Sequence, residues 1–211
     1  MLLLHSYWLS SCAHRVRIAL HHKHLPFEYV AVDIVGGSED GEVHPLRQVP
    51  TLFHDGVPIT QSLAIVEYLE DAFPEAPSLL PSTALERAAA RAIACHVESG
   101  VQPHQNLSTR GLIEGLTAQA GGDGKHVGKE YARQQVHKGL TALEALVGRT
   151  SGQFCVGDSV TVADVFLLPQ LAAAPRFRLP TSSYPTLAGI VSRLETLPAF
   201  VRAEPKNQPD A

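Results

Sequence analysis

The stretch LLLHSYWLSSCAHRVRIALHHKHLPFEYVAV, residues 2–32, decides the fold because it joins two short apolar segments through a helical one. Residues 2–4 are an apolar run, and small and apolar side chains follow at helical spacing over residues 12–23. In residues 27–32, Phe27 and Tyr29 alternate with their neighbours, which is the period of a strand. The stretch therefore predicts a β-α-β unit with a parallel pair of strands.

The next segment predicts a hairpin followed by a helix. In TLFHDGVPI, Asp55-Gly56 lies between apolar flanks, and both residues tolerate the positive φ of a tight turn. SLAIVEYLEDAF then has an amphipathic pattern, with Ser62 predicted as N-cap and Pro74 just past the end. Together with the first unit this gives the order βαβ-ββα.

Beyond a proline-rich linker the pattern becomes helical. Thr83 and Glu86 have capping-box spacing before an alanine-rich segment, and Thr161 and Asp164 repeat it. A helix with an apolar face is expected over residues 132–147, and a last one from Pro185 through Leu197. We predict a mixed α/β domain at 1–75, a linker at 76–84 and an all-helical domain at 85–211.

Composition narrows the class of protein. The chain has 211 residues, a net charge of -4 and 45% hydrophobic residues, which favour a globular protein and give no bulk attraction to nucleic acid. No apolar run approaches the roughly 20 residues of a membrane span, and the first residues lack the basic start of a signal peptide. The three cysteines have no paired spacing, so we expect reduced thiols and a cytoplasmic location.

Several short sequence motifs, in this order along the chain, resemble those of the zeta class of glutathione transferases, which includes maleylacetoacetate and maleylpyruvate isomerases. They are SSCAHRVRIAL, QVPTL, QSLAIVEYLE, VQPHQNLS, FCVGDSVTVADVFLLPQ, RF and NQPDA. The resemblance implies a thioredoxin-like, glutathione-binding domain, then a helical substrate-binding domain. It also implies glutathione as cofactor, a small electrophilic substrate, a homodimer, and a role in the breakdown of aromatic amino acids or aromatic rings.

This resemblance assigns activation of the glutathione thiol to the serine-serine-cysteine motif. A helix N-terminus favours a nearby anion, and Ser10, or failing that Ser11, can donate a hydroxyl hydrogen to the sulfur. A simple N-cap is the alternative for either serine. Cys12 is a further catalytic candidate, although His14, two residues away on the helix, is poorly placed to act as its base.

The resemblance also implies the remaining glutathione contacts. Val49-Pro50 is expected to be a cis peptide that presents the Val49 backbone to glutathione, and Gln61 with Ser62 is expected to hold its γ-glutamyl end; a trans turn and a simple cap are the alternatives. The helical domain contributes contacts from VQPHQNLS. These are Gln102, Gln105, Asn106 and Ser108.

A diacid substrate calls for cationic side chains with forked donors. Arg176 matches the Arg-Phe motif of the class, and Arg110 and His104 complete the predicted substrate contacts. Clustered His21, His22 and His24 show no metal-ligand spacing, so we expect no metal.

Two features depart from the class. Leu9 stands where relatives commonly carry arginine, and the segment 33–48 is several residues shorter than usual. Three functions therefore remain open: a glutathione-dependent cis-trans isomerase, a conjugating or dehalogenating transferase, and a non-catalytic glutathione-binding module. The departure at Leu9 favours the second. The third is opposed by the intact residues Ser10, Ser11, Gln61 and Ser62.

Overall fold

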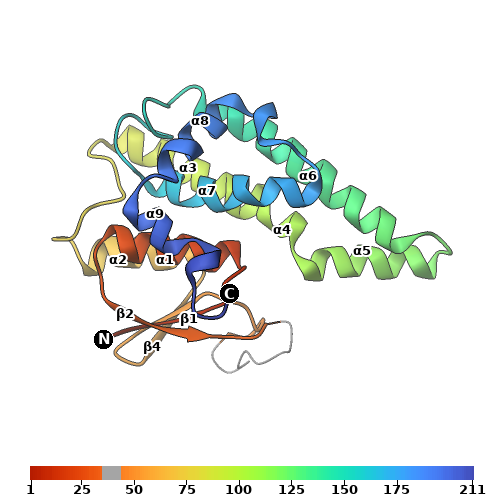
Figure 1. Ribbon diagram of the computed structural model, residues 1–211, viewed down its shortest axis with the longest axis horizontal. Coiled ribbons are helices and arrows are strands. Elements are labelled where there is room, and N and C mark those ends of the chain that lie inside the picture. The colour runs from red at the N-terminus through yellow and green to blue at the C-terminus, as the bar shows by residue number, and fades with distance from the viewer. Residues whose placement is uncertain (35–43) are drawn as a thin grey trace. The chain divides into compact units, whose positions relative to one another are not determined.

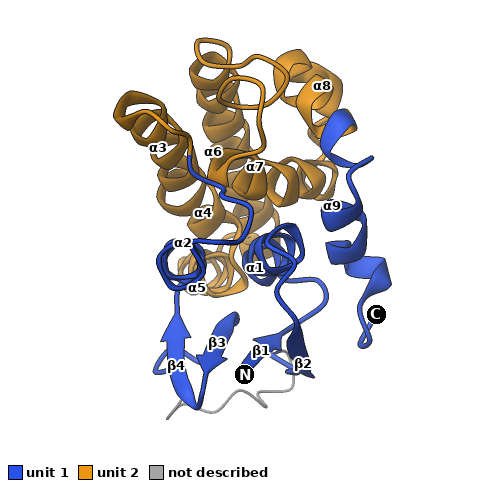
Figure 2. Cartoon of the chain, turned by 90° about the vertical axis from the view of Figure 1, so that its left-hand side faces the viewer, with its two compact units in different colours: residues 1–80, 193–211 blue, residues 81–192 orange. Residues whose placement is uncertain are grey.

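The computed structural model describes residues 1–34 and 44–211, and these form two compact units (Figure 2). Unit 1 comprises residues 1–80 and 193–211, and unit 2 comprises residues 81–192. The sequence prediction assigned everything from 85 to 211 to the helical domain, whereas the structure groups the C-terminal residues with unit 1. Much of the segment predicted to be short, 33–48, lies outside the described residues.

Unit 1 is built on a four-stranded sheet in the order β2-β1-β3-β4. Its strands are β1 (Leu2–Ser6), β2 (Phe27–Ala31), β3 (Thr51–His54) and β4 (Val57–Thr60). β1 and β2 are parallel, and β3 is antiparallel to both of its neighbours. The predicted hairpin turn is confirmed, because Asp55 and Gly56 have φ of 50° and 84°.

Strand register brings three loops to the same end of this sheet, where β1 and β4 end and β3 begins. His5, near the end of β1, pairs with Thr51 at the start of β3, and Thr51 pairs with Thr60 at the end of β4. The loop after β1, the loop before β3 and the loop after β4 therefore lie together.

Two helices lie on the same face of the sheet (Figure 1, Figure 2). α1 (Ser11–His22) buries the side chains of residues 13–20, and α2 (Ser62–Ala72) buries Ile65, Val66 and Leu69. The N-cap of α1 is Ser10, as one reading of the sequence predicted. The N-cap of α2 is Gln61, with φ of 69°, so Ser62 is the first helical residue and its prediction as N-cap is wrong by one position. Sheet and helices form the thioredoxin-like arrangement.

The C-terminal segment returns to pack on α1. The single helix predicted from Pro185 is in fact two, α8 (Pro185–Leu194) and α9 (Pro198–Ala203), because Pro198 begins a new helix. α9 lies beside α1, and η3 (Pro205–Asn207) leads into the last residues.

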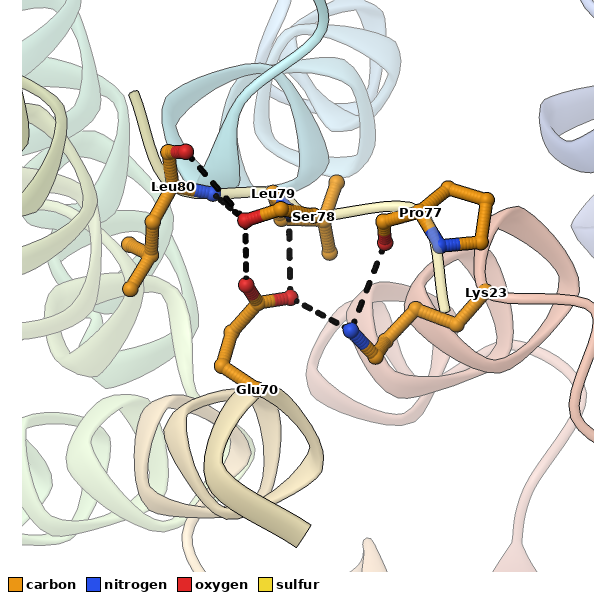
Figure 3. A network of polar contacts seen from close by, with 6 residues as sticks. All are labelled: Lys23, Glu70, Pro77, Ser78, Leu79 and Leu80. Carbon is orange, nitrogen blue, oxygen red and sulfur yellow. Dashed lines mark hydrogen bonds and ion pairs between the residues drawn. The ribbon is translucent and has the colours of Figure 1, made fainter. Parts of the chain in front are cut away.

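A buried ion pair fixes the segment that leaves α2 (Figure 3). The Nζ of Lys23 lies 2.9 Å from Oε1 of Glu70, and the two side chains are 1% and 7% exposed. Glu70 also accepts hydrogen bonds from the Ser78 hydroxyl and the Leu79 amide, and Lys23 donates to the Pro77 carbonyl. The predicted linker is therefore tied to the C-terminal ends of α1 and α2.

Unit 2 is helical in all of its described elements. They are α3 (Ala84–Gly100), α4 (Gln102–Gln105), α5 (Leu107–Gln119), α6 (Gly124–Val147), α7 (Val162–Ala173), η1 (Ala174–Phe177), η2 (Thr181–Ser183) and most of α8. Almost every residue of α7 is buried, and the predicted face of α6, from Ala132 to Val147, is buried as well. Thr83 caps α3 and the Thr161–Asp164 capping box begins α7, as predicted. None of the described helices is long and apolar enough to cross a membrane.

Candidate active site

Ser10 lies at the start of α1, at the end of the sheet where the three loops meet. Its Oγ accepts a hydrogen bond of 3.2 Å from the Ala13 amide, and its carbonyl accepts the first helical bond from His14. Ser10, Ser11 and Cys12 are all half-buried. Helix geometry leaves the amides of Ser11 and Cys12 without an intrahelical acceptor.

This capping bond does not use the hydrogen of the Ser10 hydroxyl. A serine hydroxyl has one donor hydrogen and two acceptor lone pairs, and the Ala13 amide engages only a lone pair. The hydrogen remains available to a ligand, and the capping bond fixes the oxygen that carries it. Ser10 can therefore serve both as N-cap and as a donor to an anion, and the positive end of α1 favours that anion.

The loop before β3 packs directly against the start of α1. The Val49-Pro50 peptide is cis, as the resemblance implied. Val49 is buried with Ala13 and Val32, and Tyr7 packs on this small cluster. The cluster thus holds the Val49 backbone and the Ser10 turn in one place.

Ser62 is coupled to α1 through a buried arginine. The Nη1 of Arg15 donates to the Ser62 Oγ at 3.1 Å, and both residues are buried. This bond again uses a lone pair of the hydroxyl. A carboxylate at the start of α2 would meet this hydroxyl, the first amides of the helix and the nearby positive charge of Arg15. Gln61 is exposed beside it.

His14 is a poor general base for Cys12. The imidazole is 4% exposed, and burial first, then the charges of Arg17 and Arg15, lowers the pKa of His14 to about 3. A base with so low a pKa cannot deprotonate a thiol, whose pKa is about 8.5. The burial of His14 and its low pKa therefore argue against a Cys12–His14 pair.

The residues predicted in unit 2 lie on α4, on α5 and in η1. Gln105 accepts a hydrogen bond of 2.9 Å from the buried Gln170, and His104 Nδ1 lies 2.8 Å from the Tyr131 hydroxyl. Gln102 begins α4, Asn106 separates α4 from α5, and Ser108 is exposed on α5. These five residues do not line the basic pocket described next, whereas Arg110 and Arg176 do.

This basic pocket of unit 2 has a volume of about 620 Å³ and lies between α5, the first half of α6, and η1 with the residue that follows it. Its charged walls contain six lysine and arginine side chains and two carboxylates. They are Arg110, Lys125, Lys129, Arg133, Arg176 and Arg178, with Asp123 and Glu130; His126 and Phe177 complete the lining. Sequence reasoning missed Lys125 and Lys129, although their i,i+4 spacing after the Gly-rich break places them on one helix face.

Internal ion pairs neutralise only part of this charge. Glu130 accepts two hydrogen bonds from Arg133, at 2.8 and 2.7 Å, and both side chains are exposed. Arg110 lies 3.6 Å from Glu114, and its buried Nε makes no hydrogen bond within the described part of the chain. Arg176 is exposed at the opposite wall. Arg110 and Arg176 are therefore available for an anionic ligand with more than one carboxylate.

The clustered histidines make no metal site with their neighbours. His21 and His24 share a shallow surface pocket with Phe27 and Arg202, and burial is the main reason that the pKa of His21 falls to about 4. Within residues 1–34 and 44–211, no group of three or more potential ligand side chains could hold a metal ion.

Family models match both parts of the chain. The glutathione S-transferase N-terminal domain matches residues 9–72, and the glutathione S-transferase C-terminal domain matches residues 83–200. A probable maleylacetoacetate isomerase from Caenorhabditis elegans is 46% identical over 210 residues, which cover 98% of this chain and 94% of that protein.

Solved structures are similar over the whole chain. A crystal structure of maleylacetoacetate isomerase from Anaeromyxobacter dehalogenans 2CP-1, with dicarboxyethyl glutathione and citrate bound in the active site, has a TM-score of 0.89 and 41% identity. The alignment covers 100% of this chain and 97% of that one. A holo structure of maleyl pyruvate isomerase, a bacterial glutathione S-transferase in the zeta class, has a TM-score of 0.89 and 33% identity and covers 99% of both chains.

Proposed function

This chain belongs to the glutathione S-transferase family, in its zeta class, and we propose that it catalyses the glutathione-dependent cis-trans isomerisation of a maleylacetoacetate- or maleylpyruvate-type diacid. Such a reaction belongs to the breakdown of aromatic amino acids or aromatic rings. Glutathione is the cofactor, and it is regenerated in every turnover.

The chemistry requires a thiolate and a way to hold two carboxylates. The glutathione thiolate adds to one carbon of the cis double bond, and the electron pair of that bond moves onto the conjugated carbonyl oxygen. Rotation about the new single bond follows. The electron pair then returns, the carbon-sulfur bond breaks, and the trans diacid and the thiolate are released.

In this proposal, residues of unit 1 bind glutathione and stabilise its thiolate. The Ser10 hydroxyl donates to the sulfur, and the amides of Ser11 and Cys12 with the dipole of α1 favour its negative charge. The Val49 backbone before the cis Pro50 pairs with the glutathione backbone. Gln61 and Ser62 bind the γ-glutamyl carboxylate, with Arg15 behind Ser62.

The observation that carries the choice of a diacid is the basic pocket of unit 2, which places Arg110 and Arg176 in its walls together with further cations. A neutral electrophile would not require this excess of positive charge. The Anaeromyxobacter dehalogenans 2CP-1 enzyme supports the choice, since it binds a dicarboxyethyl adduct of glutathione and citrate. In the helical unit, Gln102, His104, Gln105, Asn106 and Ser108 remain proposed contacts of glutathione or substrate.

A conjugating or dehalogenating transferase is the second candidate. Leu9 favours it, because the class commonly has a cationic side chain there, and a half-buried leucine supplies no carboxylate contact. A transferase uses the same thiolate but consumes one glutathione for every substrate molecule. The fate of the thiol therefore separates the two functions.

We also propose that the protein works as a cytoplasmic homodimer. All three cysteines are free, which suits a reducing compartment. Leu112 and Leu116, one turn apart on α5, are 63% and 58% exposed, and a partner surface would remove them from water. Light scattering of the purified protein tests the dimer, and a monomer at micromolar concentration would contradict it.

The experiment that tests the function follows the loss of maleylpyruvate absorbance with substoichiometric glutathione while free thiol is counted. We expect many turnovers per glutathione with the thiol count unchanged. Ser10→Ala should lose most of this turnover, whereas Ser11→Ala should lose less. Loss of one thiol for each substrate molecule would replace the isomerase with the transferase.

The role of the pocket is tested by Arg176→Ala, with Arg149→Ala as a matched control at an exposed arginine outside the pocket. Loss of a charged hydrogen bond should raise the KM for the diacid by at least about tenfold. The control should behave as wild type. If the KM for the diacid changes only slightly and equally in both variants, the pocket does not bind the substrate.

A further inference from the structure

The catalytic serine of the proposed function ends a tight turn. Residues 7–10 connect β1 to α1, and the Ser10 amide donates to the Tyr7 carbonyl at 3.0 Å. Trp8 and Leu9 occupy the middle of this turn, directly before Ser10. The position of the Ser10 hydroxyl therefore depends on what holds the backbone of Tyr7 and Trp8.

A buried arginine holds the carbonyl groups of this turn. Arg17, on the second turn of α1, has no exposed surface. Its guanidinium donates to the Trp8 carbonyl at 3.0 Å, to the Tyr7 carbonyl at 3.3 Å and to the Ser6 hydroxyl at 3.0 Å. Its Nε donates to the Ala203 carbonyl of α9 at 3.1 Å. The arginine thus joins the turn to the C-terminal segment.

A carboxylate from the end of the chain holds the remaining amide. One oxygen of Asp210 accepts the Trp8 amide at 3.0 Å, and the other accepts the Tyr29 hydroxyl at 2.6 Å. Tyr29 lies in β2, so the carboxylate is itself held by the sheet. Both backbone polar groups of Trp8 are therefore bound by side chains of opposite charge.

At neutral pH Arg17 keeps its charge and Tyr29 keeps its hydroxyl hydrogen. Burial lowers the pKa of Arg17 only to about 10, while Tyr29 and Asp210 act in the opposite direction, so the guanidinium stays protonated. Burial and the hydrogen bond to Asp210 raise the pKa of Tyr29 to about 12, so its hydroxyl stays a donor. Hydrogen bonds to ionised groups are shorter and stronger than neutral ones.

We propose that Asp210 and Arg17 are positioning residues that hold the turn of residues 7–10 and thereby aim the Ser10 hydroxyl at the glutathione sulfur. The inference rests on the proposed function, because it needs Ser10 to be the donor to the thiolate. It gives the last residues of the chain a role in the reaction although Asp210 is 200 positions from Ser10 in the sequence. A tail that only stabilised α9 would not need a carboxylate on the Trp8 amide.

The test compares Asp210→Ala and Asp210→Asn with Asn207→Ala. The asparagine variant keeps an oxygen that can accept the Trp8 amide, and the Asn207 control breaks a tail contact to the Val201 carbonyl without touching the turn. In each protein the ultraviolet absorbance of the bound glutathione thiolate is titrated with pH, and kcat and KM for glutathione are measured. Ser10→Ala is the reference for complete loss of the donor.

We expect Asp210→Ala to raise the pKa of the bound thiol by about one unit, which is a tenfold loss of thiolate stabilisation, with kcat lowered more than glutathione binding. Asp210→Asn should recover most of this loss, and Asn207→Ala should titrate as wild type. Where Asp210→Ala fails to fold, Asp210→Glu, which moves the carboxylate by one methylene, should give an intermediate shift.

The proposal is overturned if the Asp210 variants titrate as wild type while Ser10→Ala does not, because the tail would then be merely structural. It also fails if Ser10→Ala itself leaves the thiol pKa unchanged. The titration needs only bound glutathione, so it remains readable if the wild-type protein does not isomerise maleylpyruvate. Failure of the isomerase function and failure of the positioning role are thus separate results.

Discussion

Replacing Glu70 with alanine should be the most damaging single change in the segment that leaves α2. Three hydrogen bonds are lost: the 2.9 Å ion pair to Lys23, the 2.6 Å bond from Ser78 and the 3.0 Å bond from the Leu79 amide. Among the described residues, the buried Lys23 ammonium then keeps one hydrogen-bond acceptor, the Pro77 carbonyl (Figure 3). Removing one partner of a buried pair costs about 3–5 kcal/mol.

This loss is measured by urea and thermal unfolding followed by circular dichroism. A change of 1 kcal/mol shifts Tm by about 2–4 °C in a chain of this size, so Tm should fall by roughly 10 °C. The double variant Lys23→Met with Glu70→Leu should regain most of the stability, because it leaves no unpaired buried charge.

The matched control is the ion pair between Glu130 and Arg133. It is shorter, at 2.7 Å, but its side chains are 36% and 40% exposed. Arg133→Ala should therefore cost less than about 1 kcal/mol. If Glu70→Ala costs no more than this control, the argument from burial is wrong.

The contribution of Glu70 to the free energy of unfolding depends on pH with a defined sign. Burial alone would raise the pKa of Glu70, but the hydrogen bonds from Ser78, Lys23 and Leu79 outweigh it and lower the pKa from 4.5. The folded state therefore binds fewer protons than the unfolded state in the window below pH 4.5. The contribution of Glu70 is complete above that pH and is lost as pH falls through the folded pKa, and the loss should be missing in Glu70→Ala.

Three further predictions concern other parts of the chain. Arg15→Ala removes the donor to Ser62 and should weaken glutathione binding by about tenfold with little change in kcat, measured by calorimetry; an unchanged Kd would contradict the role of Ser62. His14 has a pKa of about 3 when folded and 6.5 when unfolded, so stability should fall by up to about 1.4 kcal/mol per pH unit as pH drops below 6.5, and His14→Gln should flatten this slope in urea titrations. Gly124→Ala would place a Cβ 2.1 Å from the Glu114 carbonyl, so unfolding should cost at least about 2 kcal/mol less; the control Gly111→Ala, where the Cβ meets no atom within 4 Å, should be at least as stable as wild type.

Features determined by neighbours in the sequence were predicted well. The Asp55-Gly56 turn and the Thr83 and Thr161 caps involve residues within three positions of each other, so their chemistry is visible in a short window. Ser62 shows the limit of such windows. A positive φ at Gln61 starts α2 one residue early, and that backbone state is uncommon for a residue other than glycine.

Features determined by distant residues were not predicted. Arg15 contacts Ser62 across 47 positions, and the Trp8 amide contacts Asp210 across 202. The apolar pattern shows that α1 is buried, but it cannot show which polar groups will meet its two buried arginines. For the same reason the sequence placed the C-terminal residues with the helical domain, whereas their partners are in unit 1.

The two sequence readings of Ser10, a helix cap and a thiol activator, are compatible in the structure. An N-cap uses the oxygen of the hydroxyl as an acceptor, and thiolate stabilisation uses its hydrogen as a donor. The Ala13 amide holds the oxygen at 3.2 Å, so the side-chain rotamer is set before glutathione binds and only the hydroxyl hydrogen has to turn toward the sulfur. Preference for serine at helix starts therefore does not weigh against a catalytic role here. The cap would fix the Ser10 oxygen for the proposed role.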